Sequence, residues 1–194
     1  MATLRSFIAI ELPEETKLEL ARLQNRLKAS CGYCPAKWVA PQSIHLTLNF
    51  LGDVDTARLE EIKQAIALTA SQFEPFELRL AESGAFPNLE RPQVVWVGLK
   101  GDIGRLEQIQ KQLELRLVPL GFRAENRPFS PHLTLARLRD EASAGDRKRL
   151  GQAIAAAACD TGCMVPVTAI NLMKSELTSA GPVYTRLASI ALGE

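Results

Sequence analysis

The tetrapeptide His45-Leu-Thr-Leu48 occurs a second time in the chain, as His132-Leu-Thr-Leu135. The two copies contain the only histidines among the 194 residues, and they lie 87 residues apart, close to half of the chain length. A repeat at this distance predicts two equivalent strands in a duplicated unit.

Each tetrapeptide has the alternation of a half-buried strand. Successive side chains of a strand point to opposite faces, so each histidine shares one face with its threonine, about 7 Å along the strand, while the two leucines share the other face. We expect the leucines to anchor the strand in a core. Two such strands beside one cleft would present two imidazoles and two hydroxyls to a ligand.

These side chains suit an in-line displacement at phosphorus. A pair of histidines can supply one protonated acid and one neutral base near neutral pH, and a threonine hydroxyl can donate to an anionic oxygen. One imidazole would take the proton of an attacking water or hydroxyl while the other protonates the departing oxygen. Such a reaction requires no metal, and a strained cyclic phosphate is its natural substrate because ring opening assists the leaving step.

Three alternative roles for the repeat are less well supported. A single His-x-Thr on a strand is common, and a buried histidine that is hydrogen-bonded to a carbonyl usually accounts for it. A metal site built on two histidines needs further carboxylate or histidine ligands, which neither tetrapeptide contains. The competing function is a non-catalytic RNA-binding module that uses the same groove.

The whole chain has the pattern of alternating helices and strands in one domain. Strands are expected at residues 4–12, 37–39, 44–51, 76–86, 93–99, 132–138, 165–177 and 184–192, and helices at 13–29, 55–73, 102–120 and 145–158. In the first helix, Leu18, Leu20, Leu23 and Leu27 should face the core. These elements predict an α+β chain over residues 1–194 with two similar lobes and a pseudo-boundary near residue 100.

The composition limits the class of protein. Hydrophobic residues make up 46% of the chain and charged residues 23%, which predicts a packed core and excludes a disordered chain. The formal charge of +1 provides no global attraction for a polyanion, so any nucleic-acid contact must be local. The sequence has no signal-peptide pattern and no apolar run that could span a bilayer, so a cytoplasmic protein without membrane contact is expected.

Four cysteines form two pairs, Cys31 with Cys34 and Cys159 with Cys163. Such spacing can bind zinc. We predict free thiols instead, because the chain has a large core of its own and no secretory signal that points to an oxidising compartment. No metal and no other cofactor is therefore expected.

The sequence resembles the two-histidine (2H) phosphoesterases, and in particular the RNA 2′,3′-cyclic phosphodiesterases that were first described as 2′-5′ RNA ligases. Outside the tetrapeptides the resemblance includes Arg5–Ile10, Trp38–Val39, Asn49–Gly52, Val94–Gly98, Phe129–Arg137, Leu172–Leu177 and Gly181–Tyr184. It implies a bilobal duplicated fold, with two antiparallel sheets flanking a central cleft and helices outside. It also implies hydrolysis of RNA 2′,3′-cyclic phosphate ends to 2′-phosphates.

The resemblance further implies roles for the four polar residues of the tetrapeptides. His45 would be the proton donor and His132 the proton acceptor, while Thr47 and Thr134 hold the phosphate oxygens. Because the tetrapeptides are identical, the residues alone leave these roles open. The implied partner is RNA with a cyclic phosphate end, such as a tRNA fragment, bound by a monomer. Ligation through a 2′-5′ bond would be a minor activity, since water is in vast excess.

Positive charge gathers around the second tetrapeptide, at Arg123, Arg127, Arg137 and Arg139. These arginines could contact an RNA backbone, although exposed arginines are also ordinary surface residues. Alternation places Arg137 on the opposite face from His132. Arg137 therefore reaches the site only if the strand ends or bulges before it.

Aromatic side chains are candidates for stacking on a nucleobase. Tyr184 is the candidate that we carry forward as an RNA contact, together with Arg127 and Arg137. Phe7, Phe50 and Phe86 are further candidates, although core packing is the commoner role of such residues.

Overall fold

The computed structural model describes residues 2–124, 128–157, 162–179 and 181–193. In chain order its elements are β1 (Thr3–Glu11), α1 (Glu14–Cys31), β2 (Ala36–Trp38), β3 (His45–Asp55), α2 (Leu59–Ala70), β4 (Phe76–Phe86), β5 (Val94–Gly101), α3 (Ile103–Leu117), β6 (His132–Leu138), α4 (Ala144–Ala156), β7 (Met164–Val167), β8 (Ala169–Thr178) and β9 (Gly181–Ala191). Single 3-10 turns lie at Pro41–Ser43, Thr56–Arg58 and Val118–Leu120.

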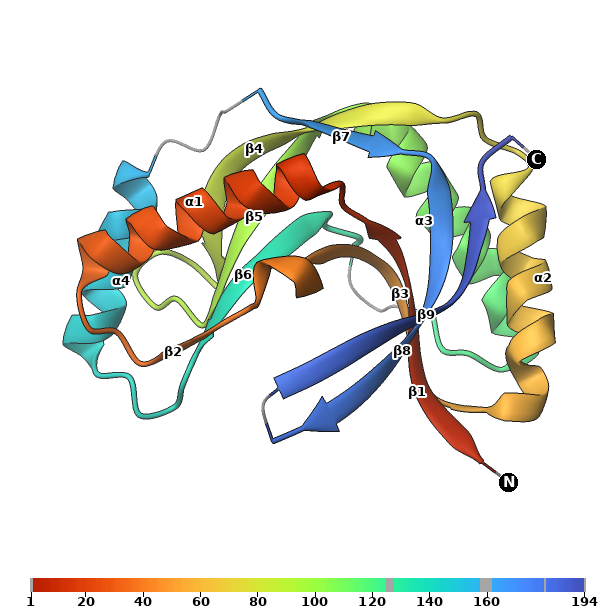
Figure 1. Cartoon of the computed structure of the whole chain (residues 1–194), viewed down its shortest axis with the longest axis horizontal. Helices are drawn as coiled ribbons and strands as arrows, with labels where there is room; N and C mark the ends of the chain where they lie inside the picture. Colours follow the sequence, from red (N-terminus) through yellow and green to blue (C-terminus); the bar gives the residue numbers. More distant parts are fainter. Residues whose placement is uncertain (1, 125–127, 158–161, 180, 194) are drawn as a thin grey trace.

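The strands form two antiparallel halves that meet along one edge. Their order is β7-β4-β5-β6-β3-β1-β8-β9, with β2 paired to β6 as well. We call β3, β1, β8 and β9 with α2 and α3 the His45 lobe, and β6, β5, β4, β7 and β2 with α1 and α4 the His132 lobe (Figure 1). The predicted α+β architecture of two antiparallel sheets with outer helices is confirmed. The two sheets are nevertheless joined, through the pair Leu46–Leu133 of β3 and β6.

The two sequence repeats exchange elements between the lobes. The order β1-α1-β3-α2-β4 recurs as β5-α3-β6-α4-β8. The first series places β1, β3 and α2 in the His45 lobe and α1 and β4 in the His132 lobe, and the second series does the reverse. As a result α1 packs on α4, and α2 packs on α3 (Figure 1). Residue 100 lies near the end of β5, and elements from both sides of it contribute to each lobe.

The 87-residue spacing of the histidines is kept in the strand register. On β1, Glu11 lies opposite His45, and on β5, Gly98 lies opposite His132. These two cross-strand partners are themselves 87 residues apart. The lobes therefore place each histidine in the same position of an equivalent strand pair.

Leucines of the tetrapeptides anchor both central strands in the core, as predicted. Leu46, Leu48, Leu133 and Leu135 are buried among the side chains that the outer helices cover. The opposite faces of β3 and β6 carry the half-buried histidines and threonines. Burial of the leucines thus fixes which face of each strand is turned toward the cleft.

Three of the four predicted core leucines of α1 are buried, namely Leu20, Leu23 and Leu27. The prediction for Leu18 is wrong, because its side chain is 57% exposed. Leu18 lies two residues before Leu20, which places it on nearly the opposite side of a helix, whereas spacings of three and four residues share one face.

The segment that the sequence predicts as one strand, residues 165–177, is two strands. β7 pairs with β4 in the His132 lobe, and β8 pairs with β1 in the His45 lobe. Thr168 separates them. The chain changes lobe at this residue, so the apolar run that looks continuous in the sequence serves two sheets.

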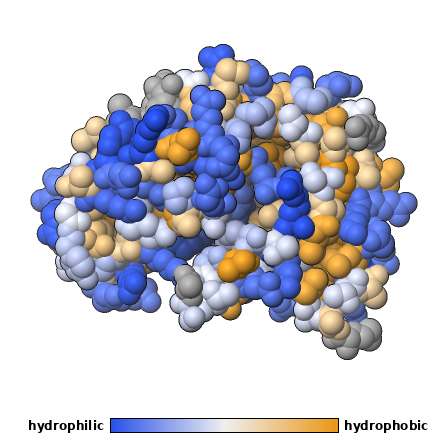
Figure 2. Space-filling view, in the orientation of Figure 1, coloured by the Kyte–Doolittle hydropathy of each residue, from blue (hydrophilic) through white to orange (hydrophobic). Residues whose placement is uncertain are grey.

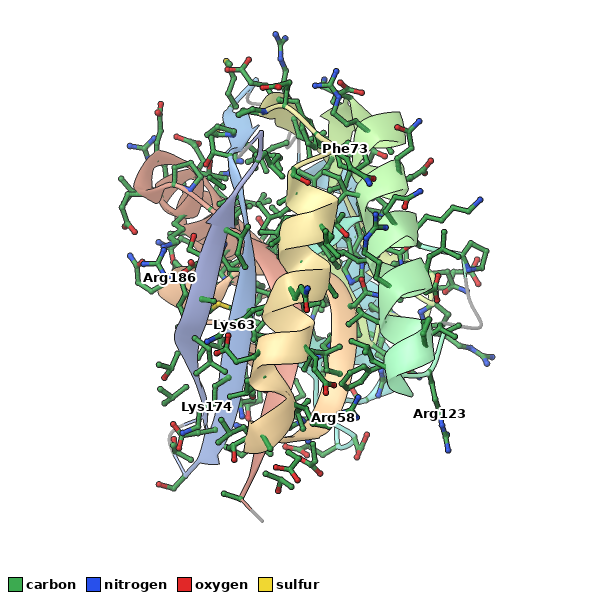
Figure 3. All side chains as sticks on the ribbon, turned by 90° about the vertical axis from the view of Figure 1, so that its right-hand side faces the viewer. Arg58, Lys63, Phe73, Arg123, Lys174 and Arg186 are labelled. Carbon is green, nitrogen blue, oxygen red and sulfur yellow. The ribbon has the colours of Figure 1, made fainter. Side chains whose placement is uncertain are left out.

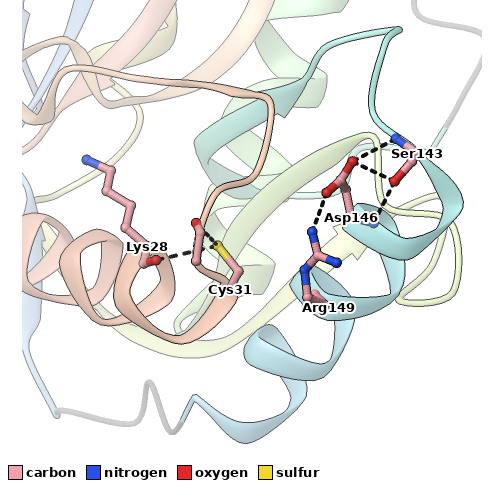
Figure 4. Close-up of polar contacts among 6 residues, drawn as sticks. Lys28, Cys31, Ser143, Asp146 and Arg149 are labelled. Atoms are coloured by element: carbon pink, nitrogen blue, oxygen red, sulfur yellow. Dashed lines mark hydrogen bonds and ion pairs between the residues drawn. The ribbon is translucent and has the colours of Figure 1, made fainter.

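Three cysteines of the described ranges are free thiols, and Cys159 lies outside those ranges. The thiol of Cys31 lies near the carbonyl oxygens of Lys28 and Gly32 (Figure 4). Burial raises the pKa of Cys31, and it raises the pKa of Cys34 to about 11. Both thiols therefore stay protonated at neutral pH, which makes them poor nucleophiles.

The first turn of α4 is fixed by a capping box (Figure 4). The Asp146 amide donates to the Ser143 hydroxyl at 3.1 Å, the Ser143 amide donates to the Asp146 carboxylate at 2.9 Å, and Arg149 pairs with the same carboxylate. Such reciprocal bonds satisfy amide groups that a helix start leaves unpaired.

In the parts of the chain that the structure describes, no helix is long and apolar enough to cross a membrane.

Candidate active site

A cleft of about 780 Å³ separates the two lobes. Its lining includes His45 and Thr47 from β3 and His132 and Thr134 from β6. The space-filling view shows the surface hollowed between the lobes, with hydrophilic side chains along the rim (Figure 2). The four polar residues singled out in the sequence thus line one cavity.

The junction of the lobes fixes how these residues face one another. β3 and β6 are antiparallel and pair at Leu46 and Leu133. In an antiparallel pair, the residue before one partner faces the residue after the other. Across the β3–β6 junction, His45 is therefore opposite Thr134, and Thr47 is opposite His132. Each histidine faces the threonine of the other repeat, and the two imidazoles occupy diagonal corners.

Both imidazoles are held by the same backbone contact. His45 Nδ1 lies 2.9 Å from the Ser43 carbonyl oxygen, and His132 Nδ1 lies 2.7 Å from the Ser130 carbonyl oxygen. A carbonyl oxygen can only accept a hydrogen bond, so Nδ1 must carry a proton in each ring. In each histidine Nε2 is therefore the nitrogen that can gain or lose a proton in the cleft.

The two threonine hydroxyls are available to a ligand. Neither Thr47 nor Thr134 makes a side-chain hydrogen bond within residues 2–124, 128–157, 162–179 and 181–193. Both side chains are half-buried in the cleft wall. A hydroxyl in this position can donate to an oxygen of a bound anion.

His45 is packed between two aromatic rings. The Phe7 ring stacks on the imidazole with 4.7 Å between centroids, and the Tyr184 ring meets it edge-on at 5.0 Å. This burial lowers the pKa of His45, while the Ser43 carbonyl and the negative charge of Glu11 act in the opposite direction. In the free protein the neutral imidazole is thus favoured relative to an exposed histidine.

His132 has a different neighbourhood. Phe86 meets its imidazole edge-on at 5.1 Å between centroids, and Trp96 packs on Phe86 at 5.3 Å. A side chain at Gly84 would place its Cβ 2.3 Å from the Trp96 ring, so glycine is needed there to make room for the indole. Apolar rings from β4 and β5 thus support His132.

A β-bulge in β6 brings Arg137 into the cleft. Trp96 pairs with Thr134, whereas Val95 pairs with Ala136, so Leu135 is an extra residue on β6. The bulge reverses the alternation after Thr134, and Arg137 joins the cleft lining. This is the condition under which the sequence allowed Arg137 to reach the site.

Tyr184 lines the cleft from the opposite lobe. Burial raises the pKa of its hydroxyl, while the positive charges of Arg137 and Arg5 act to lower it. Tyr184 of β9 and Arg137 of β6 thus interact across the space between the lobes. Both were candidates for RNA contact.

Arg123 and Arg139 of the predicted cluster are not part of the cleft lining. Arg123 is exposed and points away from the body of the protein (Figure 3). Arg139 is exposed and pairs with Glu141 at 3.7 Å. Arg127 lies outside the described residues.

Sequence reasoning missed Gln110 in α3. Its side chain is only 6% exposed, yet it lines the cleft. The helical pattern contains a signal for it, because Gln110 follows Ile109 directly and lies three residues before Leu113, on the apolar face of α3. A polar residue on a buried helix face needs a partner or a ligand.

Comparison with known proteins agrees with this geometry. The sequence model described as LigT like Phosphoesterase matches twice, over residues 10–96 and 97–184. The chain belongs to the LigT-like phosphoesterase family. The two matches correspond to the two repeats, each with one His-Leu-Thr-Leu tetrapeptide, and they confirm the predicted resemblance and the duplicated fold.

Several members of the LigT-like family are similar over nearly the full chain. An RNA 2′,3′-cyclic phosphodiesterase of Methanothermobacter thermautotrophicus is 35% identical over 182 residues, which cover 93% of this chain and 95% of that protein. A solved structure from Thermus thermophilus has a TM-score of 0.80 at 29% identity and covers 98% of both chains. Escherichia coli LigT complexed with 3′-AMP has a TM-score of 0.74 at 27% identity over all of both chains. The protein is thus an enzyme of a phosphoesterase family.

Proposed function

We propose that this protein hydrolyses RNA that ends in a 2′,3′-cyclic phosphate and leaves a 2′-phosphate. The observation that carries this proposal is the pair of imidazoles in one cleft, each with Nδ1 bound to a carbonyl and Nε2 left for proton exchange. The name of the Methanothermobacter relative supports the substrate.

Each proton in the proposed step has a defined donor and acceptor. Nε2 of neutral His132 takes a proton from water as the water oxygen bonds to phosphorus. The bond between phosphorus and O3′ breaks, and protonated His45 gives its Nε2 proton to O3′. Thr47 and Thr134 donate hydrogen bonds to the non-bridging phosphate oxygens, where negative charge accumulates. Proton exchange with solvent then restores both histidines.

This scheme draws its acid, base and hydrogen-bond donors from side chains. It needs no metal, and hydrolysis should continue at an unchanged rate in the presence of a chelator. Loss of activity on chelation would overturn this part of the proposal.

RNA contacts in the proposal come from both lobes. Arg137 supplies a positive charge for a backbone phosphate, and Tyr184 supplies a ring that can stack on an unpaired base near the cyclic end. A tRNA fragment is a substrate of this class. The same groups would catalyse 2′-5′ ligation as a minor activity if a 5′-hydroxyl replaced water.

The test is incubation of a short RNA with a 2′,3′-cyclic phosphate end in EDTA, with wild-type protein and with His45→Ala and His132→Ala. Mass and phosphatase sensitivity identify the position of the phosphate. We expect a 2′-phosphate from the wild type alone. If no variant differs from the wild type and RNA is bound without turnover, the protein is instead an RNA-binding module.

We also propose that the protein acts in the cytoplasm. We further propose that it acts as a monomer, because both histidines and both threonines of the cleft come from one chain. Sedimentation at the enzyme concentration used for the assay tests the monomer. A specific activity that rises with protein concentration would contradict it.

A further inference from the structure

The two histidines differ in the residue that faces them on the neighbouring strand. Glu11 of β1 lies directly opposite His45, whereas Gly98 of β5 lies directly opposite His132. Directly opposite residues of an antiparallel pair share a face and have their side chains close together. The repeat therefore places a glutamate opposite one histidine and a glycine opposite the other.

The Glu11 carboxylate is poorly satisfied in its position. Its Oε2 is buried and makes no hydrogen bond in the described part of the chain. The Arg186 guanidinium of β9 lies 3.3 Å from Oε2, which makes an ion pair without hydrogen-bond geometry. The Arg186 side chain is exposed on the β8–β9 ribbon (Figure 3), and the rest of the Glu11 side chain is 37% exposed. A buried carboxylate oxygen of this kind needs a positive partner nearby.

The charged and titratable groups around His45 come from several elements. Glu11 on β1 is the group whose negative charge acts on the imidazole. Tyr184 and Arg186 face this region from β9, with Arg5 of β1 and Arg137 of β6 near the Tyr184 hydroxyl. His132 lies across the cleft. Glu11 is thus the negative charge that acts on His45, and Arg186 is its positive partner.

We propose that Glu11 is a positioning residue that holds the catalytic proton on His45, with Arg186 limiting the strength of this effect. The proposal deepens the function above and rests on it for the role of His45 as the acid. The carboxylate stabilises the imidazolium form through space, as an opposite charge does for any neighbouring ion. Among the residues that the structure describes, Gly98 takes the corresponding position opposite His132, which serves as the base.

Gly98 supplies no carboxylate opposite the histidine of the other lobe. A Cβ at Gly98 would lie 3.4 Å from the Trp96 ring and 3.5 Å from the Glu82 carbonyl oxygen. The strand neighbours thus place different groups opposite the histidines of two identical tetrapeptides.

Burial of His45 makes such a residue necessary. Burial between Phe7 and Tyr184 lowers the pKa of the imidazole and works against an acid that must carry a proton. The Glu11 charge opposes this effect. Removal of the charge should lower the pKa of His45 further, and removal of the competing Arg186 charge should raise it.

NMR titration of the imidazole signals tests this directly, because the chain has two histidines and hence two sets of signals. A spectrum of His132→Asn assigns them. We expect the pKa of His45 to fall in Glu11→Gln and to rise in Arg186→Gln, while His132 moves little. Glu60→Gln, which removes an exposed carboxylate paired with Lys63 on α2, is the matched charge control. If the pKa of His45 is the same in both variants as in the wild type, the proposal is wrong. It is also wrong if the pKa values of His45 and His132 shift equally.

The pH dependence of kcat/KM provides a second test, because a purely structural role of Glu11 would not change it. An acid works only when protonated, so we expect kcat/KM of Glu11→Gln to fall roughly three- to tenfold at pH 8 and to approach the wild-type value in acid solution. Glu11→Asp should restore part of the activity at pH 8. A loss that is the same at every pH would mean that Glu11 only supports the fold.

The two proposals fail in different ways. If the wild type does not turn over a cyclic phosphate, the proposed function is wrong, and the NMR shifts still decide whether Glu11 and Arg186 control the proton on His45. If Glu11→Gln does not fold, Arg186→Gln carries the test alone. An unchanged His45 pKa in Arg186→Gln then overturns the proposal.

Discussion

The His45 lobe and the His132 lobe contain the same tetrapeptide in the same strand register, but they surround it differently. In both lobes a carbonyl two residues before the histidine holds Nδ1. Beyond that contact, His45 is enclosed by Phe7 and Tyr184 and faces a carboxylate, whereas His132 meets the edge of Phe86 and faces Gly98.

This comparison separates two properties of a catalytic residue. The tetrapeptide and its preceding carbonyl determine where the imidazole lies and which nitrogen exchanges a proton. The neighbouring strands determine how readily the imidazole holds that proton. A duplicated site can therefore acquire unlike surroundings through its flanking strands while its motif stays unchanged.

Removing either imidazole should have the largest effect. We expect His45→Ala and His132→Ala to lower kcat for a cyclic phosphate by about 10²- to 10⁴-fold, the usual contribution of a general acid or base. An aryl phosphodiester separates the roles, because p-nitrophenolate leaves without protonation. His45→Ala should then keep a much larger share of its activity than His132→Ala. The reverse order would exchange acid and base.

Removing a threonine hydroxyl should cost less. Thr47→Val and Thr134→Val keep the shape of the side chain and lose one donor to the phosphate, so a decrease in kcat of about 10- to 100-fold is expected. Proton transfer survives in both variants. Steady-state assays at saturating RNA measure this, and a loss as large as that of the histidine variants would contradict the assigned roles.

Loss of one RNA contact should reduce activity less than loss of a threonine hydroxyl. Arg137→Gln should raise KM about three- to tenfold and make it less dependent on salt, because one phosphate contact is removed. Arg139→Gln is the matched control, since Arg139 lies two residues further along the chain and pairs with Glu141 outside the cleft lining. Equal effects of the two substitutions would place the RNA elsewhere.

The smallest effect should be on stability. The folded protein lowers the pKa of His45, so the unfolded chain binds a proton on this residue at a higher pH than the folded protein does. The contribution of His45 to the free energy of unfolding is therefore lost as the pH falls below the ordinary histidine value. Thermal unfolding of wild type and His45→Gln between pH 7.5 and 5 should show the stability of the wild type falling relative to the variant. Thr47→Val keeps His45, so the difference in stability between this variant and the wild type should stay constant over the same pH range.

Much of this architecture follows from local sequence. Alternation around the tetrapeptides predicts the strands, the burial of Leu46 and Leu133, and the polar face turned to the cleft. The repeat predicts two lobes. These features depend on residues within one element, where spacing alone decides which side chains share a face.

Features that depend on distant segments were not predictable in the same way. The partnership of Glu11 with His45 arises from strand pairing, and the bulge at Leu135 that admits Arg137 arises from the fit of β6 to β5. The break at Thr168 arises because the two parts of one apolar run pair with strands of different lobes. In each case the information lies in which strand becomes a neighbour.

The exchange of elements between repeats has a consequence for how the molecule folds. One of the two partners of β1 in the sheet, β8, is synthesised about 160 residues after it. The sheet of the His45 lobe thus stays incomplete until β8 has been synthesised. Long-range pairing of this kind slows folding and favours a single cooperative transition for the whole chain. A fragment cut between the repeats should remain unfolded, because each lobe would lack strands and a helix.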